Sequence, residues 1–133
     1  MNKTILLTAS ILGMTAVMLG AFAAHGLKQL VSAEMVQTFE TGVRYQMYHA
    51  FLLLIVGNLI HLSVRTKRIV LYLTVLGVLL FSGSIYGLAT NELTRFDFKA
   101  IGFVTPIGGA LLIAAWAVLL VGFLKLKNDN YKN

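Results

Sequence analysis

The sequence predicts an all-α fold: an integral membrane bundle of four transmembrane helices, with an amphipathic interfacial helix between the first and the second. Composition is the first reason, because 58% of the 133 residues are hydrophobic and only 12% are charged, whereas a soluble domain is about one-quarter charged. The mean hydropathy is +0.82. The second reason is that the apolar residues form unbroken runs of the roughly 20 residues needed to cross a hydrocarbon core about 30 Å thick. We therefore expect residues 1–133 to form a single membrane domain.

The predicted membrane spans are about residues 4–24, 45–62, 69–89 and 105–125. The first and third are interrupted only by threonine and serine, and the fourth holds no charge before Lys125. The second becomes long enough only when its polar start at Tyr45 is included. The first run has an alternative interpretation as a secretory signal peptide, because Lys3 precedes it and small residues end it. Since a signal core has about 7–15 apolar residues and this run is longer, we favour a retained span.

An amphipathic helix is predicted at about residues 32–43. Apolar side chains recur there at helical spacing, with charged and amide side chains between them: Val31, Met35, Val36, Phe39 and Val43. Such a helix lies flat at a membrane interface with its apolar face inward. We expect it to start near Ser32, with Gly42 as the point at which the chain bends into the second span.

Small residues on three spans predict close helix packing. The first span carries a stripe of them within one narrow face: Ala9, Gly13, Ala16, Gly20 and Ala24. The third span has Gly83 and Gly87 in GxxxG spacing, which lets helices approach closely in lipid. In the fourth, we expect Thr105 to cap the helix and Pro106 to occupy its first position.

Basic residues predict the orientation of the chain, because they are retained on the cytoplasmic side of a membrane. With both termini in the cytoplasm, the inner side receives Lys3, Arg65, Lys67, Arg68, Lys125, Lys127 and Lys132. The outer side receives the smaller set Lys28, Arg44, Arg95 and Lys99. The net charge of +6 reflects this sorting, so we expect no nucleic-acid partner. The absence of cysteine excludes disulfides and thiol catalysis.

One polar cluster stands out from the apolar background. It comprises a segment at the start of the second span, together with polar residues expected at the same outer level: His25, Glu40, Arg44, Tyr45, Gln46, Tyr48, His49, Ser82, Ser84 and Tyr86. Ionisable groups in a span are costly, by about 2.5–3.5 kcal/mol at its centre on insertion scales. Glu40 and Arg44 are four residues apart and can pair on one helix face. Tyr45 and His49 share a different face.

Three interpretations of the cluster remain open. It can be structural, it can be a binding or gating site at the outer mouth of a small-solute transporter or channel, or His25 and His49 can ligate haem in a haem- or quinone-binding redox protein. Enzyme motifs and intramembrane carboxylates are missing, so we expect no enzyme, cofactor or metal site. The sequence identifies no substrate. Four short helices enclose little space, which favours a homo-oligomer in the lipid bilayer.

Four blocks in order carry a family resemblance: GAFAAHGLK at 20–28, ETGVRYQMYHA at 40–50, FSGSIY at 81–86 and TPIGG at 105–109. The chain resembles the bacterial family known as domain of unknown function 423, with Ala24 at a place where glycine is expected. The resemblance implies a multi-pass protein of the bacterial cytoplasmic (inner) membrane with no established activity. We therefore expect a structural or accessory membrane component that acts as an oligomer, with the transporter as the alternative.

Overall fold

The computed structural model describes residues 1–94, 97 and 102–127. All regular structure in those residues is helical: α1 (Asn2–Ala24), η1 (Leu27–Gln29), α2 (Ala33–Asn58), α3 (Val64–Ala89), η2 (Asn91–Leu93) and α4 (Val104–Leu124). The predicted all-α class is therefore confirmed. Arg95, Lys99 and Lys132, which the sequence assigned to loops or the tail, lie outside the described residues.

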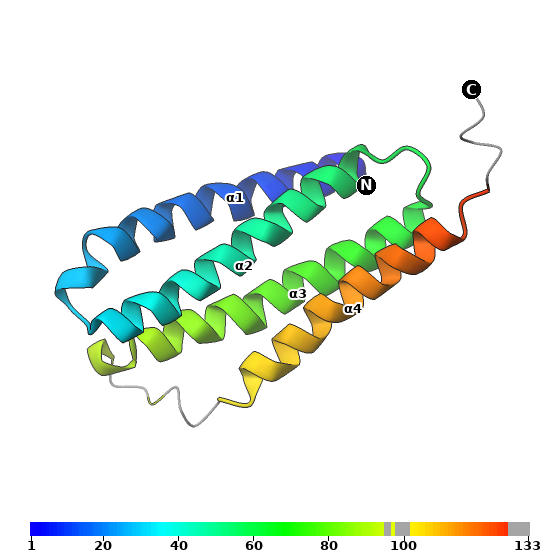
Figure 1. Ribbon diagram of the computed structural model, residues 1–133. Helices are drawn as coiled ribbons and strands as arrows, with labels where there is room; N and C mark the ends of the chain where they lie inside the picture. The colour runs from blue at the N-terminus through cyan, green and yellow to red at the C-terminus, as the bar shows by residue number, and fades with distance from the viewer. Residues whose placement is uncertain (95–96, 98–101, 128–133) are drawn as a thin grey trace.

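The four long helices lie side by side in chain order and alternate in direction (Figure 1). α1 packs against α2, α2 against α3, and α3 against α4. The start of α1 and the end of α4 lie at the same end of the molecule, and α1 and α4 form its two edges (Figure 1). α2 and α3 therefore each have a helix on both sides.

Three of the helical segments are long and apolar enough to cross a membrane: Asn2–Gln29, Val64–Ala89 and Val104–Leu124. α2 has 26 residues, which is about 39 Å of helix, but it is more polar. Part of this polarity comes from Gln46 and His49, which are buried, and part from exposed residues that include Arg44 and Asn58.

The predicted amphipathic helix and second span form one continuous helix. α2 begins where expected, because Ser32 is its N-cap and its Oγ accepts a hydrogen bond from the Met35 amide at 3.3 Å. It runs without interruption through Gly42 and ends at Asn58, so the expected bend is absent. A Cβ at residue 42 would lie 2.7 Å from Cε1 of Tyr86. Gly42 therefore permits close approach of α2 to α3.

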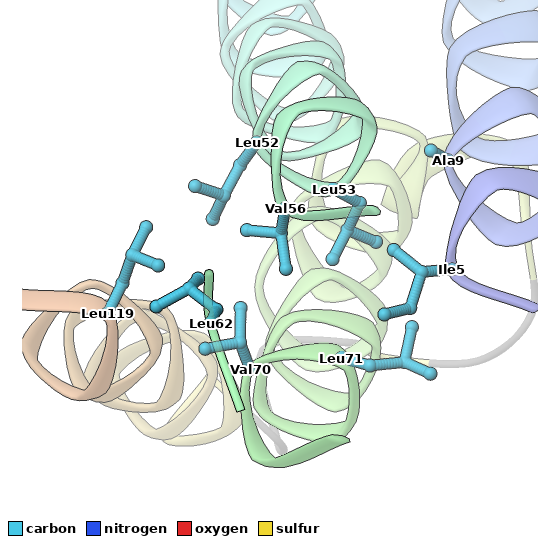
Figure 2. Close-up of a cluster of buried hydrophobic side chains, with 9 residues drawn as sticks. All are labelled: Ile5, Ala9, Leu52, Leu53, Val56, Leu62, Val70, Leu71 and Leu119. Atoms are coloured by element: carbon cyan, nitrogen blue, oxygen red, sulfur yellow. The ribbon is translucent and has the colours of Figure 1, made fainter. Parts of the chain in front are cut away.

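Two apolar clusters hold the helices together at opposite ends. The larger takes side chains from all four helices and the α2–α3 turn (Figure 2): Ile5, Ala9, Leu52, Leu53, Val56, Leu62, Val70, Leu71 and Leu119. The smaller, at the other end, contains Ala23, Leu27, Phe39 and Ala89. The predicted polar residues of α2 fall between them along the helix.

The small-residue stripe of the first span packs closely against another helix over most of its length, as predicted, and that helix is α2. Ala9 and Ala16 are buried, and a Cβ at Gly13 or Gly20 would lie 3.8 Å from Ala50 Cβ or 3.5 Å from Val43 Cγ1, respectively. Ala24 is exposed, and the adjacent Ala23 is buried in its place. At the end of α1 the buried face of the helix therefore includes Ala23 instead of the expected Ala24.

Gly77 and Gly108 allow α3 and α4 to pack closely. A Cβ at Gly108 would lie 2.7 Å from the Leu80 carbonyl carbon, and one at Gly77 would lie 2.6 Å from Leu112 Cδ2. At Gly83 a Cβ would meet nothing within 4 Å, so this glycine packs on no other part of the described chain.

The predicted cap of the fourth span is wrong. α4 starts at Val104 with Phe103 as its N-cap, so Thr105 and Pro106 lie inside its first turn. The Thr105 hydroxyl faces α3 instead, where it is hydrogen-bonded to Ser84.

Candidate functional site

Gln46 joins three helices from the middle of α2. Its side-chain Nε2 donates to the Leu12 carbonyl at 2.9 Å and to Thr15 Oγ1 at 2.7 Å, both on α1. Its Oε1 accepts from the Tyr86 hydroxyl on α3 at 2.7 Å. Because Gln46 is only 5% exposed, both amide protons and the amide oxygen are satisfied inside the protein.

His49, one turn further along α2, reaches the fourth helix. Its Nδ1 lies 2.7 Å from the Tyr45 carbonyl oxygen, and its Nε2 lies 3.2 Å from Trp116 Nε1 on α4. An indole N–H can only donate, so Nε2 is the acceptor and Nδ1 carries the proton that bonds to Tyr45. This arrangement assigns the neutral Nδ1–H tautomer and leaves neither ring nitrogen for another ligand.

Two serines make further contacts between helices. Ser82 is fully buried, and its Oγ on α3 donates to the Gly42 carbonyl on α2 at 2.7 Å. Ser84 Oγ lies 2.6 Å from Thr105 Oγ1 on α4. α3 is therefore hydrogen-bonded through side chains to both of its neighbours.

We call these interhelical groups the polar layer: Thr15, Gln46, His49, Ser82, Ser84, Tyr86, Thr105 and Trp116. Thr15, Thr105 and Trp116 were missed from the sequence. Trp116 had a usable signal, because tryptophan prefers the membrane interface and this one lies in the middle of an apolar run. Thr74 Oγ1 is buried on α3 without a hydrogen-bond partner in the described chain.

The remaining predicted residues lie on the surface rather than in the polar layer. His25 is exposed and its Nδ1 contacts only the Ala21 carbonyl, at 3.1 Å. Arg44 donates to Thr41 Oγ1 at 3.0 Å instead of forming the predicted ion pair with Glu40. Tyr45 and Tyr48 are 41% and 53% exposed, respectively. The structure therefore divides the predicted cluster into a buried part and a surface part.

The buried part also lies deeper than expected. Gln46 contacts Leu12 and Thr15, near the middle of α1, and His49 contacts Trp116, near the middle of α4. Ser82 and Tyr86 share the level of Gly42 and Gln46, to which they are hydrogen-bonded.

The two histidines expected to hold a haem are far apart along the helices. His25 follows the end of α1, whereas His49 lies 16 residues after Ala33 in α2, or about 24 Å along the axis at 1.5 Å per residue. With both nitrogens of His49 hydrogen-bonded as well, the described geometry offers no shared site for this pair.

Two surface grooves lie away from the polar layer. One, of about 500 Å³, lies between the start of α3 and the end of α4. The other, of about 360 Å³, lies where α1 and η1 face the start of α2, and Glu40 is the one predicted cluster residue in its lining. Neither is lined by a polar-layer residue.

Comparison with known proteins finds a family match over residues 19–109, described as "Protein of unknown function (DUF423)". The chain is 37% identical to the "UPF0382 inner membrane protein YgdD" of Escherichia coli strain K12, over 95% of this chain and 93% of that protein. It is 37% identical to a "UPF0382 membrane protein" of Haemophilus influenzae, over 96% of this chain and 98% of that protein. A "UPF0382 membrane protein" of Staphylococcus saprophyticus is 36% identical to the chain, over 93% of this chain and 99% of that protein. No solved structure matches the chain.

Proposed function

The chain belongs to the DUF423 family of membrane proteins, and on that premise we propose that it is a four-span accessory component of the bacterial inner membrane. In this proposal it has no catalytic centre and acts as a homo-oligomer. One observation carries the proposal: the polar side chains in the middle of the helices bond to neighbouring helices. Gln46 and His49 use their polar atoms in this way, so they act as interhelical ties.

A fourth span at α2 is part of this proposal. Lipid supplies no hydrogen bonds, so polar groups within a bilayer must be satisfied by the protein itself. α2 meets this requirement, since Gln46 bonds to α1 and α3 while His49 bonds to α4. Its 26 residues match the length of α3, against which it packs.

The orientation proposed has both termini in the cytoplasm. Lys3, Arg65, Arg68, Lys125 and Lys127 lie at the end where α1 and α3 start and α4 ends (Figure 1), and basic residues favour the cytoplasmic side. The chain has no cysteine, so single-cysteine variants report cleanly. In intact cells a membrane-impermeant maleimide should modify Lys28→Cys and leave Lys127→Cys unmodified. The reverse pattern would overturn the orientation.

Gly83 supports the oligomer. A glycine inside a helix costs about 1 kcal/mol relative to alanine, and Gly83 packs on nothing within the described chain. Contact with a second copy would explain it, because small residues allow close helix approach in lipid. Light scattering in detergent should give an oligomer for the wild type and a smaller species for Gly83→Ile. A monomeric wild type would contradict the oligomer.

Flux measurement separates the accessory role from transport. We expect vesicles containing the purified protein to pass ions and small polar solutes no faster than protein-free vesicles. His49→Ala and Arg44→Ala serve as the matched variants. Flux that is present in the wild type and lost in these variants would support the transporter and overturn the accessory role.

A further inference from the structure

The larger groove has the character of an amphiphile site. It is about 500 Å³ in volume, and it is open to the surface between the start of α3 and the end of α4. One part of its lining is polar and basic: Ser63, Arg65, Thr66 and Lys125. The rest is apolar and includes Ile69, Val118 and Val121. A ligand that fits both parts carries a charged group on an apolar body.

The polar part of the groove presents hydrogen-bond donors. Ser63 Oγ accepts from the Thr66 amide at 3.1 Å and donates to Thr66 Oγ1 at 2.9 Å. The Thr66 hydroxyl proton is then free to point into the groove. Arg65 and Lys125 are exposed there, and a planar guanidinium donates two parallel hydrogen bonds to a phosphate.

The described residues at this end of the molecule carry positive charge, which favours an anion. The described carboxylates lie towards the opposite end, where α2 starts and α3 ends (Figure 1). They are Glu34 and Glu40 in α2, Glu92 in η2, and Asp97 between η2 and α4. Arg68 and Lys127 add positive charge beside the groove without lining it. The start of α3 contributes in the same sense through its helix dipole.

The apolar part of the groove is open to the surface of two membrane-length helices. Ile69 is 38% exposed and Val121 is 47% exposed, and both helices are apolar enough to cross a membrane. Gly122 keeps α4 close to α3 here, since a Cβ at this position would lie 3.0 Å from Thr66 Cγ2. An acyl chain running along the helices would cover these side chains.

We propose that this groove binds one anionic phospholipid, with its phosphate held by Arg65 and Lys125 and an acyl chain lying on Ile69 and Val121. Basic pockets between transmembrane helices are recognised sites for anionic headgroups. The site goes beyond the proposed function and does not depend on oligomerisation.

The test compares dioleoyl phosphatidylglycerol with dioleoyl phosphatidylcholine, which share acyl chains and differ in headgroup charge. Binding to the full chain in detergent is measured by native mass spectrometry for the wild type and two double variants. Arg65→Gln with Lys125→Gln removes two positive charges from the groove. Arg68→Gln with Lys127→Gln removes two positive charges that lie outside the groove. We expect the first to lower the preference for phosphatidylglycerol roughly fivefold per charge, or about 25-fold in all, and the second to preserve it. An equal loss in both variants, or a loss in neither, overturns the site.

Two further arms separate the contribution of charge from that of the acyl chain. The charge-preserving exchange Arg65→Lys with Lys125→Arg should keep the preference, and its loss would show that the groove does not act through charge. Glycerol phosphate, which has no acyl chain, should not displace phosphatidylglycerol at equal concentration. If it does, the site is one for soluble phosphates and the lipid assignment is wrong.

Discussion

The Tyr86 hydroxyl on α3 lies 2.7 Å from Gln46 Oε1 on α2, and Gln46 bonds at the same time to Leu12 and Thr15 on α1. One buried amide thus fixes the spacing of three helices. In a bilayer no water replaces such bonds when they are lost. The polar layer is therefore where changes in stability should be concentrated.

Gln46→Leu should lower the stability of the helix assembly by about 1–2 kcal/mol, because interhelical hydrogen bonds in membranes contribute about 0.6 kcal/mol each and at most about 1.7. Thermal unfolding in detergent measures the change. Gln37→Leu is the matched control, since Gln37 is an exposed residue on the same helix. If the Gln46→Leu variant is as stable as the wild type, Gln46 has no structural role.

His49 and Trp116 should be energetically coupled across α2 and α4, because their side chains are bonded at 3.2 Å. We expect the double variant His49→Leu with Trp116→Phe to be more stable than the sum of the single variants implies, by about 0.6–1.7 kcal/mol. A thermodynamic cycle of unfolding in detergent gives the coupling. Strict additivity would mean that the contact contributes nothing.

Two glycines on α3 and α4 should respond oppositely to alanine. At Gly108 the new Cβ would meet backbone, 2.8 Å from Phe81 Cα, so Gly108→Ala must push the helices apart and should cost about 1–3 kcal/mol. At Gly83 the Cβ would meet nothing within the same described chain, so in a detergent that keeps the protein monomeric helix propensity should make Gly83→Ala neutral or more stable by up to about 1 kcal/mol. Similar melting temperatures for the two variants would contradict the observed packing of α3 on α4.

The buried side chain of Lys67 forms a part-buried hydrogen bond with Asn2 at the start of α1. It is 3% exposed, and its Nζ lies 3.0 Å from Asn2 Oδ1. Asn2→Ala should cost about 1.5–3 kcal/mol, the usual range for a hydrogen bond to a charged group. In a Lys67→Met background, the same substitution should cost close to nothing. If Asn2→Ala costs the same in both backgrounds, the contact is not the cause.

Much of the fold was predictable because lipid imposes simple length and hydropathy requirements. The apolar runs that predict the first, third and fourth spans correspond to α1, α3 and α4, and Ser32 was correctly placed at the start of a helix. Gly42 was misjudged. Its sequence signal is that of a bend, but close approach of Tyr86 and Ile85 from α3 accounts for it equally well, and only the packing distinguishes the two.

The candidate site was predictable by residue type but not by partner. Gln46, His49, Ser82, Ser84 and Tyr86 were expected in a polar cluster, and the structure places them in the polar layer. The amphipathic segment continues into the rest of α2 as one helix, so Gln46 and His49 lie in the middle of α2 rather than at its start. Spacing along one helix also favoured the pairing of Arg44 with Glu40, whereas Arg44 donates to the Thr41 hydroxyl.

The most direct measurement is the reactivity of a single cysteine at Ser82, where the hydroxyl is fully buried between α3 and α2. Cysteine is close to serine in size, and the natural chain contains none. In native membranes Ser82→Cys should stay unmodified by a water-soluble maleimide, while exposed Lys28→Cys reacts and both react after denaturation in SDS. Rapid modification of Ser82→Cys in native membranes would show a water-filled path through the polar layer and contradict its role as a closed structural tie.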